Sequence, residues 1–231
     1  MLRLTELTLP IDHPDEALRP AVLRRLGVGE EALQSLTVFK RSYDARKKNT
    51  ALQFVYTVDV ALHDEAAVLA RLNGDRHVGV APDTRYRPVA QARGDEPHRP
   101  LVIGFGPCGV FATLVLAQMG FRPIVLERGK AVRERTQDTW GLWRRRVLDP
   151  ESNVQFGEGG AGLFSDGKLY SQIKDPRHYG RKVLQEFVRA GAPEEILYVA
   201  KPHIGTFRLT GVMEKMRASI ESLGGEIRFG Q

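Results

Sequence analysis

The sequence predicts an α/β chain of two domains, and three observations support this prediction. Leu101–Ile103 form a short apolar run that leads directly into a glycine-rich turn, as a buried parallel strand does before a helix. The part of the chain before this run also has apolar residues at the spacing typical of strands and helices, but it has no glycine fingerprint of its own. A segment rich in proline and arginine separates the two stretches. We therefore expect an N-terminal α/β domain at 1–85, a linker at 86–99 and a second domain at 100–231.

The elements of the N-terminal domain are predicted from alternating and helical apolar spacing. Pro20 would kink a helix interior, so the first helix is expected to start a few residues into its range. A polar turn is expected at Lys47–Asn49, between two longer strands. Together these elements predict an α/β sandwich, for which a ferredoxin-like arrangement is one candidate. The expected strands are Leu2–Leu9, Ser35–Tyr43 and Ala51–Leu62, and the expected helices are Asp15–Leu26 and Glu65–Leu72.

The second domain begins with glycines in the spacing G-x-G-x-x-G, at Gly104, Gly106 and Gly109. Gly104 would allow a tight turn, Gly106 would let the backbone approach a pyrophosphate, and Gly109 would let the next helix pack closely on the strand. That helix starts around Pro107 and Cys108 with unpaired amides, which can bind a pyrophosphate. The spacing therefore favours a dinucleotide-binding, Rossmann-type unit over an ordinary glycine turn.

An acidic residue follows the second predicted strand of this unit, Pro123–Leu126. Glu127 lies about twenty residues past the glycines, where such folds place an acid on the ribose hydroxyls of an adenosine. An acid here would repel a 2′-phosphate, so FAD or NAD is favoured over NADP, although Arg128 beside it weakens that preference. The alternative is a solvated glutamate in an ordinary α/β domain.

A second glycine-rich stretch, Asn153–Ser171, argues against a regular helix or strand. In a flavin-binding chain this stretch would run past the pyrophosphate toward the flavin ring, with backbone amides available to either group. A mobile surface loop is an alternative of equal weight. The backbone amides expected at the cofactor are those of Gly159, Gly160, Ala161 and Gly162, and the polar side chains expected nearest the chemistry are Ser165, Asp166 and Lys168.

Three segments together resemble a known family: GFGPCG at 104–109, ERG at 127–129 and SNVQFGEGGAGLFSDGKL at 152–169. They are similar to bacterial FAD-dependent dehydrogenases, largely uncharacterised, that join a small N-terminal α/β domain to a flavin-binding module. The segments FKRSYDARKKNTALQFVYTVDV and KPHIGTFRLTGVMEKMRASIESLGGEIRF extend the resemblance over nearly the whole chain. Cys108 stands where the family usually has alanine or another small residue.

The resemblance implies an FAD-dependent oxidoreductase that transfers hydride through a bound flavin to or from an unknown small-molecule substrate. NAD(P)H is a candidate electron donor. The alternatives are a simple NAD-dependent dehydrogenase and a flavin- or nucleotide-sensing protein without turnover. No catalytic residue is assigned; His203 is a candidate general acid or base, ranked below a structural hydrogen bond.

The second domain is expected to be incomplete at its C-terminus. Gly224–Phe229 is predicted as a further strand of the same sheet, and the chain ends directly after it. Flavin modules of this type usually end in a Gly-Asp pair that holds the ribityl chain, and no such pair follows Glu127. We therefore expect a fragment that holds only the first part of a flavin module.

Composition and charge exclude several classes of protein. No apolar run approaches the ~20 residues needed to cross a bilayer, and the first residues are unlike a signal peptide, so a cytoplasmic protein without a membrane partner is expected. The formal net charge of +6 and the basic residues at 41–48 leave nucleic-acid binding open, ranked below a solvated hairpin. The scattered histidines predict no metal site.

Two smaller predictions concern burial. Cys108 is the single cysteine and is interpreted as a small packing residue rather than a reactive thiol. Trp140 and Trp143 are expected to face the core, with Arg144–Arg146 on the exposed side of the same helix.

Overall fold

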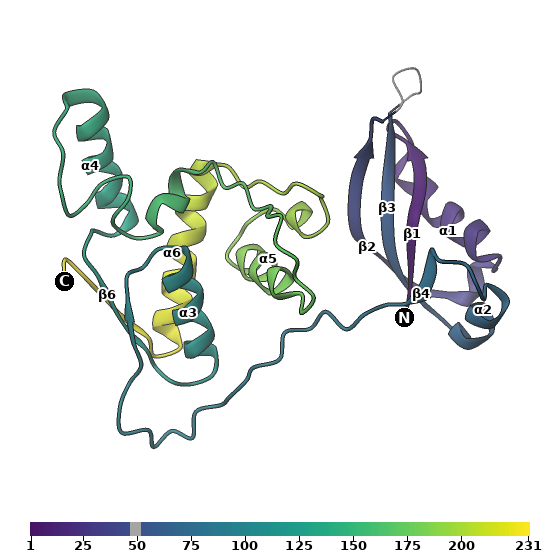
Figure 1. Cartoon of the computed structure of the whole chain (residues 1–231), viewed down its shortest axis with the longest axis horizontal. Helices are drawn as coiled ribbons and strands as arrows, with labels where there is room; N and C mark the ends of the chain where they lie inside the picture. The colour runs from purple at the N-terminus through teal and green to yellow at the C-terminus, as the bar shows by residue number, and fades with distance from the viewer. Residues whose placement is uncertain (47–51) are drawn as a thin grey trace. The chain divides into compact units, whose positions relative to one another are not determined.

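The computed structural model describes residues 1–46 and 52–231 (Figure 1). The polar turn predicted at Lys47–Asn49 lies outside the described residues. The chain divides into two compact units, Met1–Thr84 with Leu197–Ala200, and Arg85–Ile196 with Lys201–Gln231. Both are α/β, one around an antiparallel sheet and the other around a parallel sheet.

The first unit has the chain order strand, helix, strand, strand, helix, strand, which is that of a ferredoxin-like sandwich. Its four-stranded sheet has the order β2-β3-β1-β4, and all neighbouring strands are antiparallel. Its core contains Leu2, Leu4, Val58 and Val60 from the strands, packed with Val22 of the first helix. The elements are β1 Leu2–Pro10, α1 Leu18–Leu26, β2 Leu33–Asp44, β3 Gln53–Leu62, α2 Glu65–Arg71 and β4 Val78–Val80.

The first helix starts later than Asp15, because a 3-10 turn occupies Asp15–Ala17 and the α-helix begins at Leu18. This start places Pro20 in the first turn, where a missing backbone N–H costs nothing. The helix ends at Gly27, whose φ of 63° is left-handed. β4 was not predicted, because three residues with a central Gly79 are too few to show a periodic pattern.

The second unit is built on three parallel strands in the order β5-β6-β7, with helices in the connections between them. Val102, Val125 and Ile227 occupy matched positions on the three strands and belong to the core with residues of α3 and α6. The elements are β5 Leu101–Ile103, α3 Pro107–Gln118, β6 Ile124–Glu127, α4 Val132–Arg145, η3 Gly160–Phe164, α5 Tyr179–Arg189, α6 Thr206–Ser222 and β7 Glu226–Phe229.

The prediction that β5 is a buried strand is wrong. Leu101 is 58% exposed and Ile103 is 74% exposed, whereas Val102 between them packs on the core. Side chains alternate between the two faces of a sheet, and only the face of Val102 carries α3 and α6. A continuous apolar run therefore marked a strand that is buried on one face only.

The prediction that the tryptophans of α4 face the core is also wrong. Trp140 is 47% exposed and Trp143 is 60% exposed, and the guanidinium carbon of Arg144 lies 4.4 Å from the centre of the Trp140 ring. The buried positions of this helix include Val132, Arg135 and Thr139, so an arginine occupies the core-facing stripe instead. No helix among the described residues has the length and apolar character that a membrane crossing requires.

Candidate functional site

Two glycine-rich loops meet in the second unit, and their backbones are in direct contact. The amide of Gly159 donates to the carbonyl of Phe105 over 2.8 Å. A Cβ on Gly160 would lie 3.0 Å from the Cα of Gly106, and a Cβ on Gly162 would lie 2.8 Å from Cγ of Pro107. The second glycine stretch is therefore a shaped segment that packs against the first loop.

The three glycines of the first loop have separate structural roles. Gly104 has a φ of 87°, which side chains rarely adopt, and it makes the turn after β5. A Cβ on Gly109 would lie only 2.0 Å from the carbonyl oxygen of Gly104, so α3 can pack on β5 only with glycine there. Gly106 has an extended backbone at the start of α3, and the nearest atom to its Cβ position is the Cα of Gly160 at 3.8 Å. Gly106 therefore leaves open space at the start of α3.

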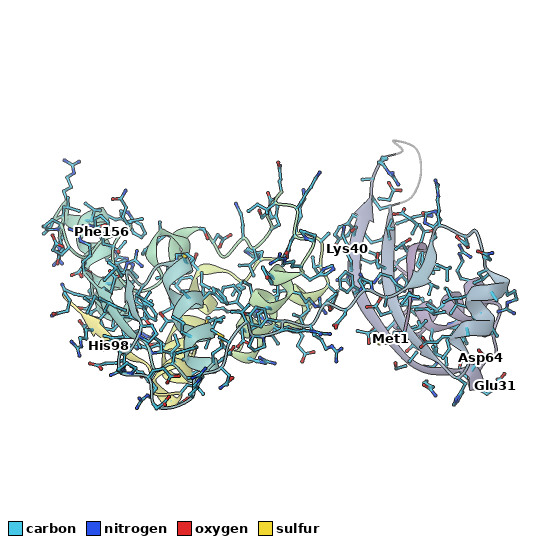
Figure 2. All side chains as sticks on the ribbon, turned by 60° about the horizontal axis from the view of Figure 1, so that its bottom comes forward. Met1, Glu31, Lys40, Asp64, His98 and Phe156 are labelled. Atoms are coloured by element: carbon cyan, nitrogen blue, oxygen red, sulfur yellow. The ribbon has the colours of Figure 1, made fainter. Side chains whose placement is uncertain are left out.

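A cavity of about 400 Å³ opens where β5 and β6 end. Its walls include Gly104 and Gly106 of the first loop, Gly160 of the second, and the pair Arg128 and Phe156. The guanidinium carbon of Arg128 lies 4.1 Å from the centre of the Phe156 ring, within the range of a cation–π contact. Figure 2 labels Phe156 on the segment that follows α4. Ligands of open parallel sheets bind at this end of the strands.

Glu127 lines this cavity, yet the residue is only 4% exposed and its carboxylate accepts hydrogen bonds from three backbone amides. Oε2 accepts from Phe105 over 2.6 Å, and Oε1 accepts from Gly129 over 2.8 Å and from Gly157 over 2.9 Å. Glu127 thus ties both glycine loops to the end of β6, a role that the sequence did not suggest. A carboxylate has about four acceptor positions, so one is left for the ribose hydroxyl predicted from the sequence.

Replacing Glu127 with alanine should lower the free energy of unfolding by about 2 to 3 kcal/mol, because buried amides lose their acceptor. Urea denaturation would measure this loss. The free energy of unfolding of Glu127→Gln, which keeps one acceptor oxygen, should lie between those of the parent chain and Glu127→Ala. Glu151→Ala is the control, since Glu151 is exposed and pairs only with Arg128 of the described residues. An equal loss in both alanine variants would contradict the role assigned to Glu127.

Arg135 is a fully buried cation whose burial was not predicted from the sequence. Its guanidinium donates to the carbonyls of Asn153 and Val154, each over 2.7 Å, and to that of Glu158 over 2.6 Å. Burial lowers the pKa of Arg135 to about 10, while the nearby carboxylates Glu127 and Glu158 act in the opposite direction. Val132, Arg135 and Thr139 have the spacing of a buried helix face, and this spacing is the feature of the sequence that could have predicted the burial of Arg135.

Glu158 is a fully buried acid in the second glycine loop. Its Oε2 accepts from the amide of Val132 over 2.8 Å, at the start of α4. Its Oε1 lies 3.5 Å from Nε of Arg217 and forms no hydrogen bond with a described residue. The 3.5 Å contact is an ion pair rather than a hydrogen bond. Burial raises the pKa of the Glu158 carboxyl, opposed by the Val132 amide and by Arg217.

The raised pKa of Glu158 predicts a pH-dependent stability. The folded state holds the proton at higher pH than the unfolded state, so the stability contributed by protonation is present below the ordinary pKa of 4.5 and is lost as pH rises through the folded pKa. Thermal unfolding of the Glu158→Gln variant between pH 4 and pH 8, a span of about 4 units, should show a weaker decline with rising pH than the parent chain. Parallel curves for the two proteins would contradict this expectation.

Several other residues predicted to lie at the cofactor have environments that differ from the prediction. Contrary to expectation, the amides of Gly159 and Gly160 are not free donors, because they bind the carbonyls of Phe105 and Gly157 inside the protein. Cys108 is exposed in the first turn of α3 instead of packed, since the core-facing residues of that turn begin with Val110. Ala161 is exposed, and the hydroxyl of Ser165 donates to the carbonyl of Gly162 over 2.6 Å.

Asp166, Lys168 and His203 are brought together by a short backbone ladder. Lys168 pairs with His203 in an antiparallel bridge, and Oδ2 of Asp166 lies 3.1 Å from Nε2 of His203. Asp166 adopts a φ of 63°, which is uncommon outside glycine and marks a constrained turn. His203 thus has a carboxylate partner within hydrogen-bond distance, the structural hydrogen bond that was ranked above a role as general acid or base.

Comparison with known proteins finds two similarities. Residues 1–61 match a domain of unknown function, DUF8436. The chain is 41% identical over 228 residues to an uncharacterized protein of Clostridium beijerinckii, and the match covers 99% of this chain and 42% of that relative. The chain therefore spans less than half the length of this relative.

Proposed function

We propose that this chain carries the nucleotide-binding part of an FAD-dependent oxidoreductase. The observation that carries the proposal is the cavity of about 400 Å³ where β5 and β6 end, lined by the G-x-G-x-x-G loop and by Arg128 and Phe156. The three parallel strands with helical connections, in the order β5-β6-β7, support this proposal, because half of a Rossmann-type sheet would have this order. A glycine fingerprint in that context is the usual site of a dinucleotide pyrophosphate.

The chain's own residues suit the ADP portion of such a cofactor. The first amides of α3 carry the positive end of the helix dipole and would bind the pyrophosphate, and Gly106 leaves room for it. Arg128 and Phe156 offer a flat surface for adenine, and the remaining acceptor position of Glu127 suits a ribose hydroxyl. When bound, FAD supplies hydride transfer through its isoalloxazine ring, while the protein orients it.

The preference for FAD or NAD over NADP remains a proposal. Its physical reason is no longer repulsion by Glu127 but the lack of a free cation at Arg128. The Glu127 carboxylate is saturated by amides, so its repulsion of a 2′-phosphate is reduced. Arg128 is paired with Glu151, its Nε lying 2.8 Å from Oε2, so it is not a free cation for that phosphate. We therefore expect ADP to bind more tightly than 2′,5′-ADP.

Calorimetric titration of the purified chain with ADP tests the nucleotide site. ADP should bind, FAD should compete with it, and 2′,5′-ADP should bind more weakly. If neither ADP nor FAD binds, the proposed site is wrong. Tighter binding of 2′,5′-ADP would overturn the preference and favour an NADP-dependent protein.

The flavin itself is tested on the longer Clostridium beijerinckii relative. Its absorbance spectrum should show bands near about 370 and 450 nm, typical of a bound oxidised flavin. Loss of the 450 nm band on addition of NADH or NADPH, with recovery by an electron acceptor, would support an oxidoreductase with that donor. A flavin that is never reduced would favour a sensing protein, and a colourless protein that binds NAD would favour a simple dehydrogenase.

Nucleic-acid binding by the first unit is the weaker alternative, because several of its cations are already paired. Arg3 forms two hydrogen bonds to Asp59, of 2.7 and 2.8 Å, and its guanidinium carbon lies 3.5 Å from the centre of the Phe39 ring. Arg46 pairs with Asp44 over 2.7 Å. These pairs reduce the positive field that phosphates require.

A further inference from the structure

A second cavity, of about 290 Å³, lies in the same unit among α3, η3, α5 and α6. Apolar side chains from three helices form most of its wall: Val110 and Phe111 of α3, Val183 and Phe187 of α5, and Leu209 and Met213 of α6. The rings of Phe111 and Phe187 meet edge to face, with centres 5.2 Å apart. The cavity is therefore suited to a flat or compact hydrophobic group.

This cavity is separated from the first one by the contact between the two glycine loops. Gly106 and Gly160 line the first cavity, whereas Pro107, Gly159 and Gly162 line the second. The wall between them is thin, because it consists of glycine backbone and one proline ring in contact. A molecule in the second cavity would lie one loop away from the pyrophosphate position proposed above.

Among the described residues, two polar side chains line the second cavity, those of Ser165 and Lys168. The Ser165 hydroxyl is engaged with the Gly162 carbonyl, and Lys168 is exposed and forms no ion pair with a described residue. The ladder that carries Lys168 is held by hydrogen bonds from Leu169 to the Pro202 carbonyl over 2.9 Å and from Ile204 to the Gly167 carbonyl over 3.0 Å. A backbone held by hydrogen bonds thus places the Lys168 ammonium, which has no ion-pair partner among the described residues, beside an apolar cavity.

We infer that the second cavity is a substrate site for a small hydrophobic molecule, of one or two rings, that carries an acidic head group. The volume of about 290 Å³ lies at the lower end of ligand cavities, which sets the size of the apolar body. Lys168 supplies the charge complement to the head group. The role of this cavity as a substrate site rests on the proposed oxidoreductase function, whereas binding itself does not.

The probe for this site is 1-naphthoate, which joins two fused rings to a carboxylate, with 1-naphthalenemethanol as its neutral counterpart. Calorimetric titration of the purified chain should detect binding of both. Val183→Phe should raise the dissociation constant of each at least about tenfold by filling the cavity. Lys168→Gln should raise that of naphthoate by about threefold to fivefold, as expected for an exposed ion pair, and leave that of the alcohol unchanged.

Matched variants serve as controls. Val188→Phe changes a partly buried residue of the same helix that does not line the cavity, and Lys174→Gln removes an exposed cation elsewhere. Both should keep the parent affinity. If Val183→Phe fails to fold, as judged by circular dichroism, the Lys168 pair still decides the question, because its side chain is exposed.

Several outcomes would overturn the inference: no binding of either probe, equal weakening by the paired valine variants, or equal weakening by the paired lysine variants. An ADP titration on the same sample separates this inference from the proposed function. Naphthoate and ADP should bind together, since they occupy different cavities. Naphthoate binding without ADP binding would refute the nucleotide site alone, and the reverse result would refute the second site alone.

Discussion

Replacing Gly106 with valine should abolish ADP binding and leave the chain folded. The loss expected is at least about 100-fold in affinity, which corresponds to about 2.7 kcal/mol. The reason is steric: Gly106 borders the cavity at the start of α3, and a branched side chain there would occupy the space proposed for the pyrophosphate. Calorimetric titration with ADP would measure the loss.

The fold should survive this change because the protein itself leaves room at Gly106. Apart from its chain neighbours, no atom of the described residues lies closer than 3.8 Å to the Cβ position, and the φ of −73° is one that valine adopts readily. Gly109→Val, by contrast, should disrupt folding, because a Cβ at Gly109 would lie 2.0 Å from the carbonyl oxygen of Gly104. Gly211→Val, in open space on α6, is the control for binding. Wild-type ADP affinity in a folded Gly106→Val protein would refute the site.

The parts of the fold that could be predicted are those encoded by local pattern. The run Leu101–Ile103, the glycines after it and the apolar face of α3 lie within one short stretch, so propensity and spacing define strand, turn and helix. The strand within Gly224–Phe229 was predicted in the same way, and β7 pairs beside β6. The antiparallel pairing of β2 with β3 agrees with the prediction of two long apolar strands that lie close together in the sequence.

Burial could not be predicted from the same patterns, because it depends on which distant elements cover a residue. Ile103 and Trp143 are apolar but remain 74% and 60% exposed, although the Trp143 ring meets that of Phe164 edge to face with centres 5.8 Å apart. Arg135 is polar but buried, because carbonyls from Asn153 to Glu158 reach it from another part of the chain. Glu127 was predicted at the nucleotide from its position alone, whereas its three amide partners lie on three separate turns.

The buried guanidinium of Arg135 leads to a second large effect, on the stability of the fold. Replacing Arg135 with methionine should lower the free energy of unfolding by about 3 to 5 kcal/mol, the range for removing one member of a buried charged network. The carbonyls of Asn153, Val154 and Glu158 would lose their donors, and methionine fills a similar volume without replacing them. Urea denaturation followed by circular dichroism would measure the loss.

Arg133→Met is the matched control. Arg133 lies on the same helix and forms a solvent-exposed ion pair with Glu214 over 2.7 Å. Its removal should change the free energy of unfolding by less than about 1 kcal/mol, as for other exposed ion pairs. The loss in Arg135→Lys should lie between those of Arg133→Met and Arg135→Met. Lysine keeps the charge, but one ammonium group cannot donate to all of the carbonyls that the planar guanidinium binds at once. Similar losses at positions 133 and 135 would show that the carbonyl network contributes little.

The same substitution should also reduce ADP binding, although Arg135 does not line the nucleotide cavity. Arg135 binds the carbonyls on both sides of Gln155 and Phe156, which do line it, and Glu127 holds Gly157 in the same segment. Without the guanidinium, the segment loses the anchor that keeps Phe156 against Arg128. ADP affinity that falls in Arg135→Met but not in Arg133→Met would therefore link the buried cation to the site, and unchanged affinity in both would confine Arg135 to a role in stability.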